Sequence, residues 1–256
     1  MKAADDPAPE TKSFLEHLED LRGTIIRAAI ALGVGILIVI PFIPTILELL
    51  KAPLTGLVED PDRFLRSLEV VGAFNASMRI AFWSGLLVSA PIVIIILGGF
   101  IFPALTKREQ SVVLKSSGFA VLLFAFGVFL GYRFTLPFAL QAMFGLNTWL
   151  GVQAEWTLTS YVSFTTQLLI AFGLAFEMPV VVLILGRLGI LSATQLRNGR
   201  KIAVIVILIV GAILTPPDVV SQLIMSIPLL LLYELCIWVV WMWEKKAGET
   251  ALEESA

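Results

Sequence analysis

Residues 70–102 read VVGAFNASMRIAFWSGLLVSAPIVIIILGGFIF and contain a single charged side chain, Arg79. A helix needs about 20 apolar residues to cross the roughly 30 Å hydrocarbon core of a bilayer. Only helices and closed barrels satisfy their backbone hydrogen bonds in that medium, and this run is far too long for a barrel strand. It therefore predicts a membrane-spanning helix.

Similar apolar runs lie on both sides of it, in a chain of 256 residues that is 58% hydrophobic and only 15% charged. Together they predict an all-α fold, a polytopic integral membrane protein with six kinked transmembrane helices. The expected spans are Ile25–Ile46, Val70–Phe102, Val112–Leu140, Leu158–Gly186, Ile202–Leu214 and Val219–Val240. The fifth and sixth spans are expected to be short, and the fifth would cover only about 20 Å and thin the bilayer locally.

Basic residues mark one set of span ends as cytoplasmic, because Lys and Arg gather on that side of a membrane. Most of them fall beside these ends: Lys2, Lys12, Arg22, Arg27, Lys107, Arg108, Lys115, Arg187, Arg197, Arg200, Lys201, Lys245 and Lys246. Both termini are then cytoplasmic, in a bacterial inner membrane. We expect disordered cytoplasmic segments at 1–12 and 244–256 around one membrane domain at 13–243, with Trp238, Trp241 and Trp243 as an interfacial belt.

Prolines lie in or beside nearly every span, and each removes a helical hydrogen bond and tends to bend the helix. A single one is easily tolerated in lipid, but together they predict a curved bundle. The prolines with an expected structural role are Pro53, Pro103, Pro179, Pro216 and Pro217.

The segment after Ser13 predicts a two-faced helix that starts with a capping box, Ser13 and Glu16. Its acids Glu16, Glu19 and Asp20 lie on one face, where like charges repel unless a cation sits opposite them. From these residues alone, a solvated polar face, with Arg22 and Arg27 nearby as partial compensation, is the favoured interpretation. A second group, Phe100 to Glu109, places one carboxylate beside two cations in a short cytoplasmic loop.

Glu177 lies about 15 Å along the fourth span from its cytoplasmic end, near the middle of the bilayer. A carboxylate there costs about 2.5 to 3.5 kcal/mol on insertion scales, so it predicts a functional site. Near the opposite surface, Thr215-Pro216-Pro217-Asp218 predicts a hard turn between spans five and six. Asp218 could simply cap the sixth helix, or with Gln222 it could dock the polar side chain of a partner.

Five stretches, in order along the chain, resemble one known family. They are SFLEHLEDLR at 13–22, APL at 52–54, FIFPALTKRE at 100–109, FEMP at 176–179 and LTPPDVVSQ at 214–222. Together they closely resemble TatC, the multi-spanning receptor subunit of the twin-arginine protein translocase, from about Ser13 to Trp243. Each motif is weak alone, but five in register are specific.

The resemblance implies a receptor for twin-arginine signal peptides of folded proteins, with export driven by the proton-motive force. The implied peptide-binding residues are Asp20 and Glu109, with Phe100 nearby, and the family more usually has glutamate at the position of Asp20. From the charges beside them we add Glu16, Glu19 and Lys107 as candidates. The implied docking residues for partner helices are Glu177, Thr215 and Gln222, to which we add Asp218 from the turn itself. The implied partners are TatB-like and TatA-like single-span subunits, signal peptides, lipid and further copies of the receptor.

Two other classes of protein remain open as rivals. A small-solute secondary transporter would want several intramembrane charges and inverted repeats, and uptake by the purified protein in liposomes would favour it. An intramembrane enzyme would want a nucleophile or metal motif, and we find neither HExxH nor GxSxG. Cys236 and His17 are each the only residue of their kind, so we expect no disulfide and no metal site. With no catalytic motif either, we expect no enzyme and no cofactor, and we expect no nucleic-acid partner.

Overall fold

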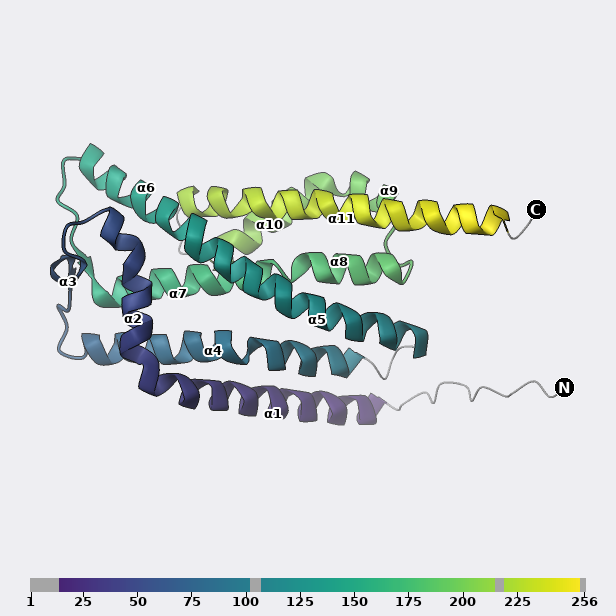
Figure 1. The fold of residues 1–256 in the computed structure, drawn as a ribbon, viewed down its shortest axis with the longest axis horizontal. Coiled ribbons are helices and arrows are strands. Elements are labelled where there is room, and N and C mark those ends of the chain that lie inside the picture. The colour runs from purple at the N-terminus through teal and green to yellow at the C-terminus, as the bar shows by residue number, and fades with distance from the viewer. Residues whose placement is uncertain (1–13, 102–106, 215–218, 254–256) are drawn as a thin grey trace.

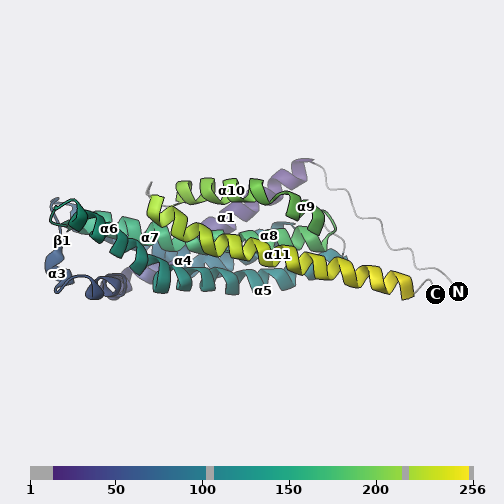
Figure 2. The ribbon, with the colours of Figure 1, turned by 90° about the horizontal axis from the view of Figure 1, so that it is seen from above.

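The computed structural model describes residues 14–101, 107–214 and 219–253, and almost all of them are helical. The long helices run roughly along one axis of an elongated molecule (Figure 1), which is thinner when turned by 90° (Figure 2). The start of α1 (Phe14–Val39) and the end of α11 (Val219–Glu253) lie at the same end of the molecule, as an even number of crossings requires. We call this the α1 end, and the opposite end, where α3 (Pro61–Phe64) lies, the α3 end.

The first span is a bent pair of helices, because two prolines interrupt it. Helix α1 covers Phe14–Val39, a single 3-10 turn covers Ile40–Phe42, and α2 follows at Ile43–Lys51. Pro41 and Pro44 stand in the first turns of the second and third pieces, where the missing N–H costs little. The expected span of Ile25–Ile46 therefore crosses a kink, as its prolines predicted.

The connection to the second span forms a small cap at the α3 end. A 3-10 segment at Ala52–Gly56 begins with Pro53 near its N-terminus, and α3 (Pro61–Phe64) and the two-residue strand β1 (Leu65–Arg66) follow. Asp60 caps α3 by accepting hydrogen bonds from the backbone of Asp62 and Arg63. Strand β1 pairs in parallel with β2 (Trp156–Thr157), so the cap joins two distant parts of the chain.

The second and third spans are long. Helix α4 covers Gly72–Ile101, which matches the expected Val70–Phe102, and carries Pro91 inside it. Helix α5 (Lys107–Leu130) continues through a π-helical segment, Gly131–Thr135, into α6 (Leu136–Trp149). The third span is thus longer than the expected Val112–Leu140, and its irregular turn precedes Pro137.

The fourth span, expected as Leu158–Gly186, is broken in the middle, beside Pro179, one of the prolines that predicted bends. Helix α7 covers Leu158–Ala175 and α8 covers Met178–Arg187, so Phe176 and Glu177 form the junction. Pro179, which is buried in the first turn of α8, has no N–H to donate to the carbonyl of Ala175. Helix α7 supplies much of the main core, with Leu168, Phe172 and others of its side chains fully buried.

The last spans differ in length more than we expected. After the short helix α9 (Ala193–Asn198), α10 covers Arg200–Leu214, about 22 Å, so the fifth span is short. Helix α11 covers Val219–Glu253 and is about 52 Å long. The expected short sixth span agrees with the membrane-length segment Ser226–Lys246 of 21 residues, but the helix continues beyond it, and the residues from 244 to 253 are helical. The segment EKKAGETALE is rich in good helix formers, so the helix continues beyond its apolar part.

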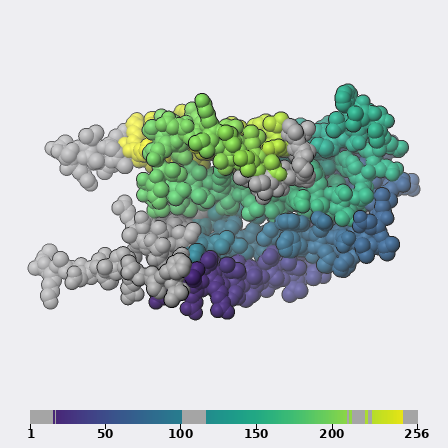
Figure 3. Space-filling model, turned by 180° about the vertical axis from the view of Figure 1, so that it is seen from behind, coloured from purple at the N-terminus to yellow at the C-terminus, as the bar shows by residue number. Residues whose placement is uncertain are grey.

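Five described segments are long and apolar enough to cross a membrane, and α10 is the shorter sixth helix. Many large apolar side chains are exposed on them, such as Ile30 at 60% and Leu37 at 69% on α1. Helix α1 forms one edge of the molecule, seen in purple in Figure 3, and packs mainly on α4. Apolar side chains exposed in this way are stable only where lipid or another apolar helix covers them.

Candidate functional sites

Two glycines decide which residues meet at the α1 end. Gly35 of α1 and Gly85 of α4 face each other so closely that a methyl group on Gly35 would lie 2.5 Å from the carbonyl oxygen of Gly85. Because the helices are antiparallel, moving back along α1 corresponds to moving forward along α4. Asp20 lies fifteen residues before Gly35 on α1, and Phe100 lies fifteen residues after Gly85 on α4. Asp20 and Phe100 are therefore at about the same height along the two helices.

The acids of α1 differ in their surroundings. Glu16 and Glu19 are exposed, whereas Asp20 is half-buried. Thr24, one turn further on, is almost completely buried and donates a hydrogen bond to the backbone carbonyl of Asp20 at 2.8 Å. The side of α1 that carries Asp20 and Thr24 thus packs inward. Its apolar side is exposed instead, including Leu18, Leu21 and Ile25, because the medium around the spans is lipid.

The remaining peptide-binding candidates lie at the same end of the molecule. Phe100 is half-buried near the end of α4, and Lys107 and Glu109 belong to the first turn of α5. The side chains of these two residues, and the whole of Pro103 and Ser13, lie outside the described residues. The helices nevertheless bring the starts of α1 and α5 and the end of α4 to one end of the molecule (Figure 1).

Glu177 stands at the junction of α7 and α8 and lines an apolar cavity of about 370 Å³. The walls come from α4, α5, α7 and α8, and include Leu97, Phe124 and Val181. The Oε1 atom of Glu177 is buried and has no hydrogen-bond partner among the described residues. A buried polar atom without a partner is costly, so Glu177 is an acceptor kept in an apolar part of the protein at an energetic cost.

The docking residues between α10 and α11 are only partly described. Thr215, Pro216, Pro217 and Asp218 lie outside the described residues. Gln222 lies in the first turns of α11, and its Nε2 atom donates a hydrogen bond to the carbonyl of Leu208 on α10 at 2.8 Å. At least one donor of this amide therefore ties the two helices together, a role that the sequence did not indicate.

A cluster of polar contacts on α11, which we did not predict as a unit, holds the connection from α8 to α10 at the α1 end. Tyr233 donates to the carbonyl of Leu196, Glu234 pairs with Arg200 at 2.8 Å, and Glu244 accepts from the backbone of Ala193. The expected tryptophan belt takes part in it. Trp243 lies under the guanidinium of Arg187 at 5.3 Å, and Trp241 under that of Arg197 at 6.0 Å.

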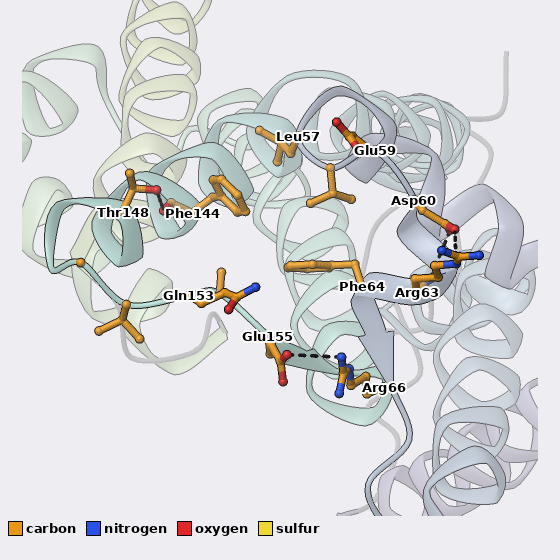
Figure 4. Close-up of a pocket in the computed structure, with 14 residues that line it drawn as sticks. Leu57, Glu59, Asp60, Arg63, Phe64, Arg66, Phe144, Thr148, Gln153 and Glu155 are labelled. Carbon is orange, nitrogen blue, oxygen red and sulfur yellow. Dashed lines mark hydrogen bonds and ion pairs between the residues drawn. The ribbon is translucent and has the colours of Figure 1, made fainter.

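The α3 end holds an open cavity of about 610 Å³, lined by both charged and apolar side chains, between the cap and the loop from α6 to β2 (Figure 4). Phe64 projects into the middle of this region and packs edge-on against Trp156, with ring centroids 5.1 Å apart. Below it, Arg66 of β1 and Glu155 form an ion pair at 3.4 Å. No residue of this cavity stood out in the sequence, because none belongs to a motif and the Arg66–Glu155 pair joins residues distant in the chain.

Comparison with known proteins places the chain in one family. The family model described as "Sec-independent protein translocase protein (TatC)" matches residues 16–228. A protein of that name from Carboxydothermus hydrogenoformans is 36% identical over 229 residues, covering 89% of this chain and 92% of its own. Another from Aquifex aeolicus is 34% identical over 87% of this chain and 92% of its own.

A solved structure supports the same assignment at the level of the fold. The crystal structure of a twin arginine translocase receptor, TatC, superimposes with a TM-score of 0.78 at 33% identity, covering 88% of this chain and 98% of the other. With its membrane-length helices, the present protein is a multi-pass membrane protein of the bacterial inner-membrane type and a component of protein transport. The chain belongs to the TatC family of Sec-independent protein translocase proteins.

Proposed function

We propose that this protein is the receptor subunit of a twin-arginine translocase, which binds the signal peptides of folded proteins at its α1 end. The observation that carries the proposal is the register of α1 on α4, which brings Asp20 level with Phe100 beside the start of α5. Glu16 and Glu19 are exposed close by on α1, and Glu109 and Lys107 start α5.

The chemistry of arginine explains why carboxylates suit this task. A guanidinium offers a rigid fork of donors that a carboxylate meets with two parallel hydrogen bonds, whereas the ammonium of lysine is a point charge. Several carboxylates around one helix end can therefore prefer two arginines over two lysines. The apolar part of the peptide would lie against the exposed apolar side of α1 and its neighbours, because this surface needs an apolar cover, which lipid otherwise supplies.

A second surface, around Glu177, is proposed to dock single-span partner helices of the TatB and TatA type. Its buried Oε1 atom, without a described partner, can accept a hydrogen bond from a polar side chain on such a helix. We propose that Thr215, Asp218 and Gln222 form a second contact with the partner helices, near the membrane surface opposite the proposed peptide site. In this proposal both termini are cytoplasmic, several receptors associate in one complex, and the proton-motive force drives export.

The test is the binding of a signal peptide with two arginines and of the same peptide with two lysines. Purified protein in nanodiscs should bind the arginine peptide at least tenfold more tightly, because charge-assisted bonds contribute about 1.5 to 3 kcal/mol when shielded. Glu109→Gln should abolish this preference while the protein stays folded. Glu69→Gln, which changes an exposed acid at the α3 end, is the matched control and should change nothing.

Equal binding of the two peptides by the unmodified protein would contradict the proposal. Undiminished crosslinking of the arginine peptide to the Glu109→Gln variant would remove Glu109 from it. Solute uptake by the protein alone in liposomes would instead favour the transporter alternative.

A further inference from the structure

Two cavities meet at Glu155, at the α3 end. The first is the cavity under the cap, and the second is a groove of about 410 Å³ between α6 and α7. Glu155 lines both, so its carboxylate lies where they adjoin. Both volumes fall in the range of small-ligand sites, which is roughly 300 to 1,000 Å³.

The groove changes from apolar to polar along its length. Leu140, Met143 and Phe164 line it further inside the apolar spans, whereas Asn147, Thr157 and Ser160 line it beside Glu155. The Asn147 amide donates to the carbonyl of Met143, which leaves its side-chain oxygen as an acceptor. A ligand that fits must therefore have an apolar part and a polar head joined in that order.

The groove also lies where two membrane-length segments, Ser117–Trp149 and Leu158–Arg187, end and begin, which is the level expected for lipid head groups. Helix α6 ends at Trp149, which is 80% exposed, and α7 begins at Leu158. Trp156 and Tyr161 stack at the groove with centroids 6.4 Å apart, and such amphipathic rings are enriched at membrane interfaces.

The charges around Glu155 favour a lipid head group that carries one positive and one negative charge and whose amine can donate hydrogen bonds. Arg66 pairs with Glu155 at 3.4 Å, and both side chains remain more than half exposed, so a ligand can reach either. In the cavity under the cap, Arg63 pairs with Asp60, while Glu59 forms no ion pair with a described residue. The cavity thus has two cations and three acids, an excess of one negative charge.

We propose that the joined cavities bind one phospholipid with a primary-amine head group, of the phosphatidylethanolamine class. One acyl chain lies in the groove between α6 and α7, the ammonium donates to the carboxylate of Glu155, and the phosphate accepts from Arg66. A primary ammonium has three donors for these acceptors, whereas the quaternary ammonium of a choline lipid has none. An anionic lipid without an amine is repelled by the excess negative charge of the cavity. With cytoplasmic termini, this lipid belongs to the periplasmic leaflet.

The experiment compares three lipids with the same acyl chains, bearing ethanolamine, choline or glycerol head groups. Purified full-length protein is titrated with each, and native mass spectrometry counts the lipids that stay bound. We expect about a tenfold preference for the ethanolamine lipid, equivalent to about 1.4 kcal/mol. Glu155→Gln should remove this preference. Arg66→Gln should weaken the binding of all three lipids alike, and the control Glu69→Gln should leave the preference intact.

A measurement on the unmodified protein keeps the proposal testable even if a variant does not fold. An ethanolamine lipid with a photoreactive acyl chain should crosslink to the segments around Met143 and Phe164. Equal retention of the ethanolamine and choline lipids would overturn the proposal. So would crosslinks confined to the exposed apolar side of α1, because the lipid would then bind as bulk solvent.

Discussion

Single acids of this protein differ mainly in what surrounds them. Glu16 and Glu19 are exposed at the α1 end, where water solvates a carboxylate at little cost. Glu177 has a buried oxygen with no described partner beside an apolar cavity. An acid kept in the second setting works against stability, so its retention points to a binding role.

Replacement of Glu177 should therefore separate stability from partner binding. For Glu177→Ala and Glu177→Leu we expect a melting temperature equal to or above that of the parent, because no described intramolecular hydrogen bond is lost. Crosslinking to a single-span partner helix should fall, while binding of the signal peptide stays near normal. Thermal unfolding in detergent and site-specific photocrosslinking measure the two effects.

Glu177→Gln serves as the control, because its amide oxygen can still accept a hydrogen bond, and it should retain part of the partner contact. Unchanged partner crosslinking and export in Glu177→Ala would show that the acid has no docking role.

Pairs of helices approach each other closely where glycine removes the side chain. Gly35 and Gly85 hold α1 against α4, and a methyl group on Gly127 of α5 would lie 2.8 Å from the carbonyl oxygen of Phe172 on α7. In lipid, where apolar burial drives association weakly, such close backbone contact supplies much of the packing energy. The height of one helix on another therefore depends on these positions.

Gly35→Leu should displace α1 along or away from α4 and so misplace Asp20 relative to Phe100. We expect a loss of about 1 to 3 kcal/mol from overpacking and at least a tenfold weaker binding of the arginine peptide. Thermal unfolding and peptide titration in nanodiscs measure these effects.

The matched control is Gly33→Leu, two residues earlier on the same helix, where an added methyl group meets nothing within 4 Å. It should bind the peptide as the parent does. If both variants bind normally, the α1–α4 register does not build the peptide site.

At the scale of the whole molecule, the long helices separate the α1 end from the α3 end (Figure 1). The connection from α8 to α10 is anchored to α11 at the first end, through Tyr233, Glu234 and Glu244. The two parallel strands close the cap at the second end. The proposed peptide site and the proposed lipid site are thus separated by the membrane.

Labelling of single cysteines tests which end faces the cytoplasm. In a Cys236→Ala background, Glu69→Cys at the α3 end should react with a membrane-impermeant maleimide in intact cells. Asn198→Cys, exposed at the end of α9, should react only after the membrane is permeabilised. The reverse pattern would place the termini outside and contradict the proposed peptide site.

Local properties of the chain were enough to predict several features of this protein. Hydropathy over about 20 residues predicted the membrane-length runs, and the prolines predicted the bends after Val39 and near Pro179. The motif series predicted the family. Helix ends were less accurate, since α11 extends through good helix formers to Glu253 where we expected a disordered tail.

The sequence alone therefore determined the medium, the spans and the family, because these follow from side-chain polarity and backbone chemistry read locally. The tertiary structure decided which side chains meet. It brought Asp20 level with Phe100, turned Gln222 toward Leu208, left Glu177 without a described partner and joined Arg66 to Glu155. Such contacts depend on how far one helix is shifted along another, which is set by close packing between residues distant in the chain and has no local signal.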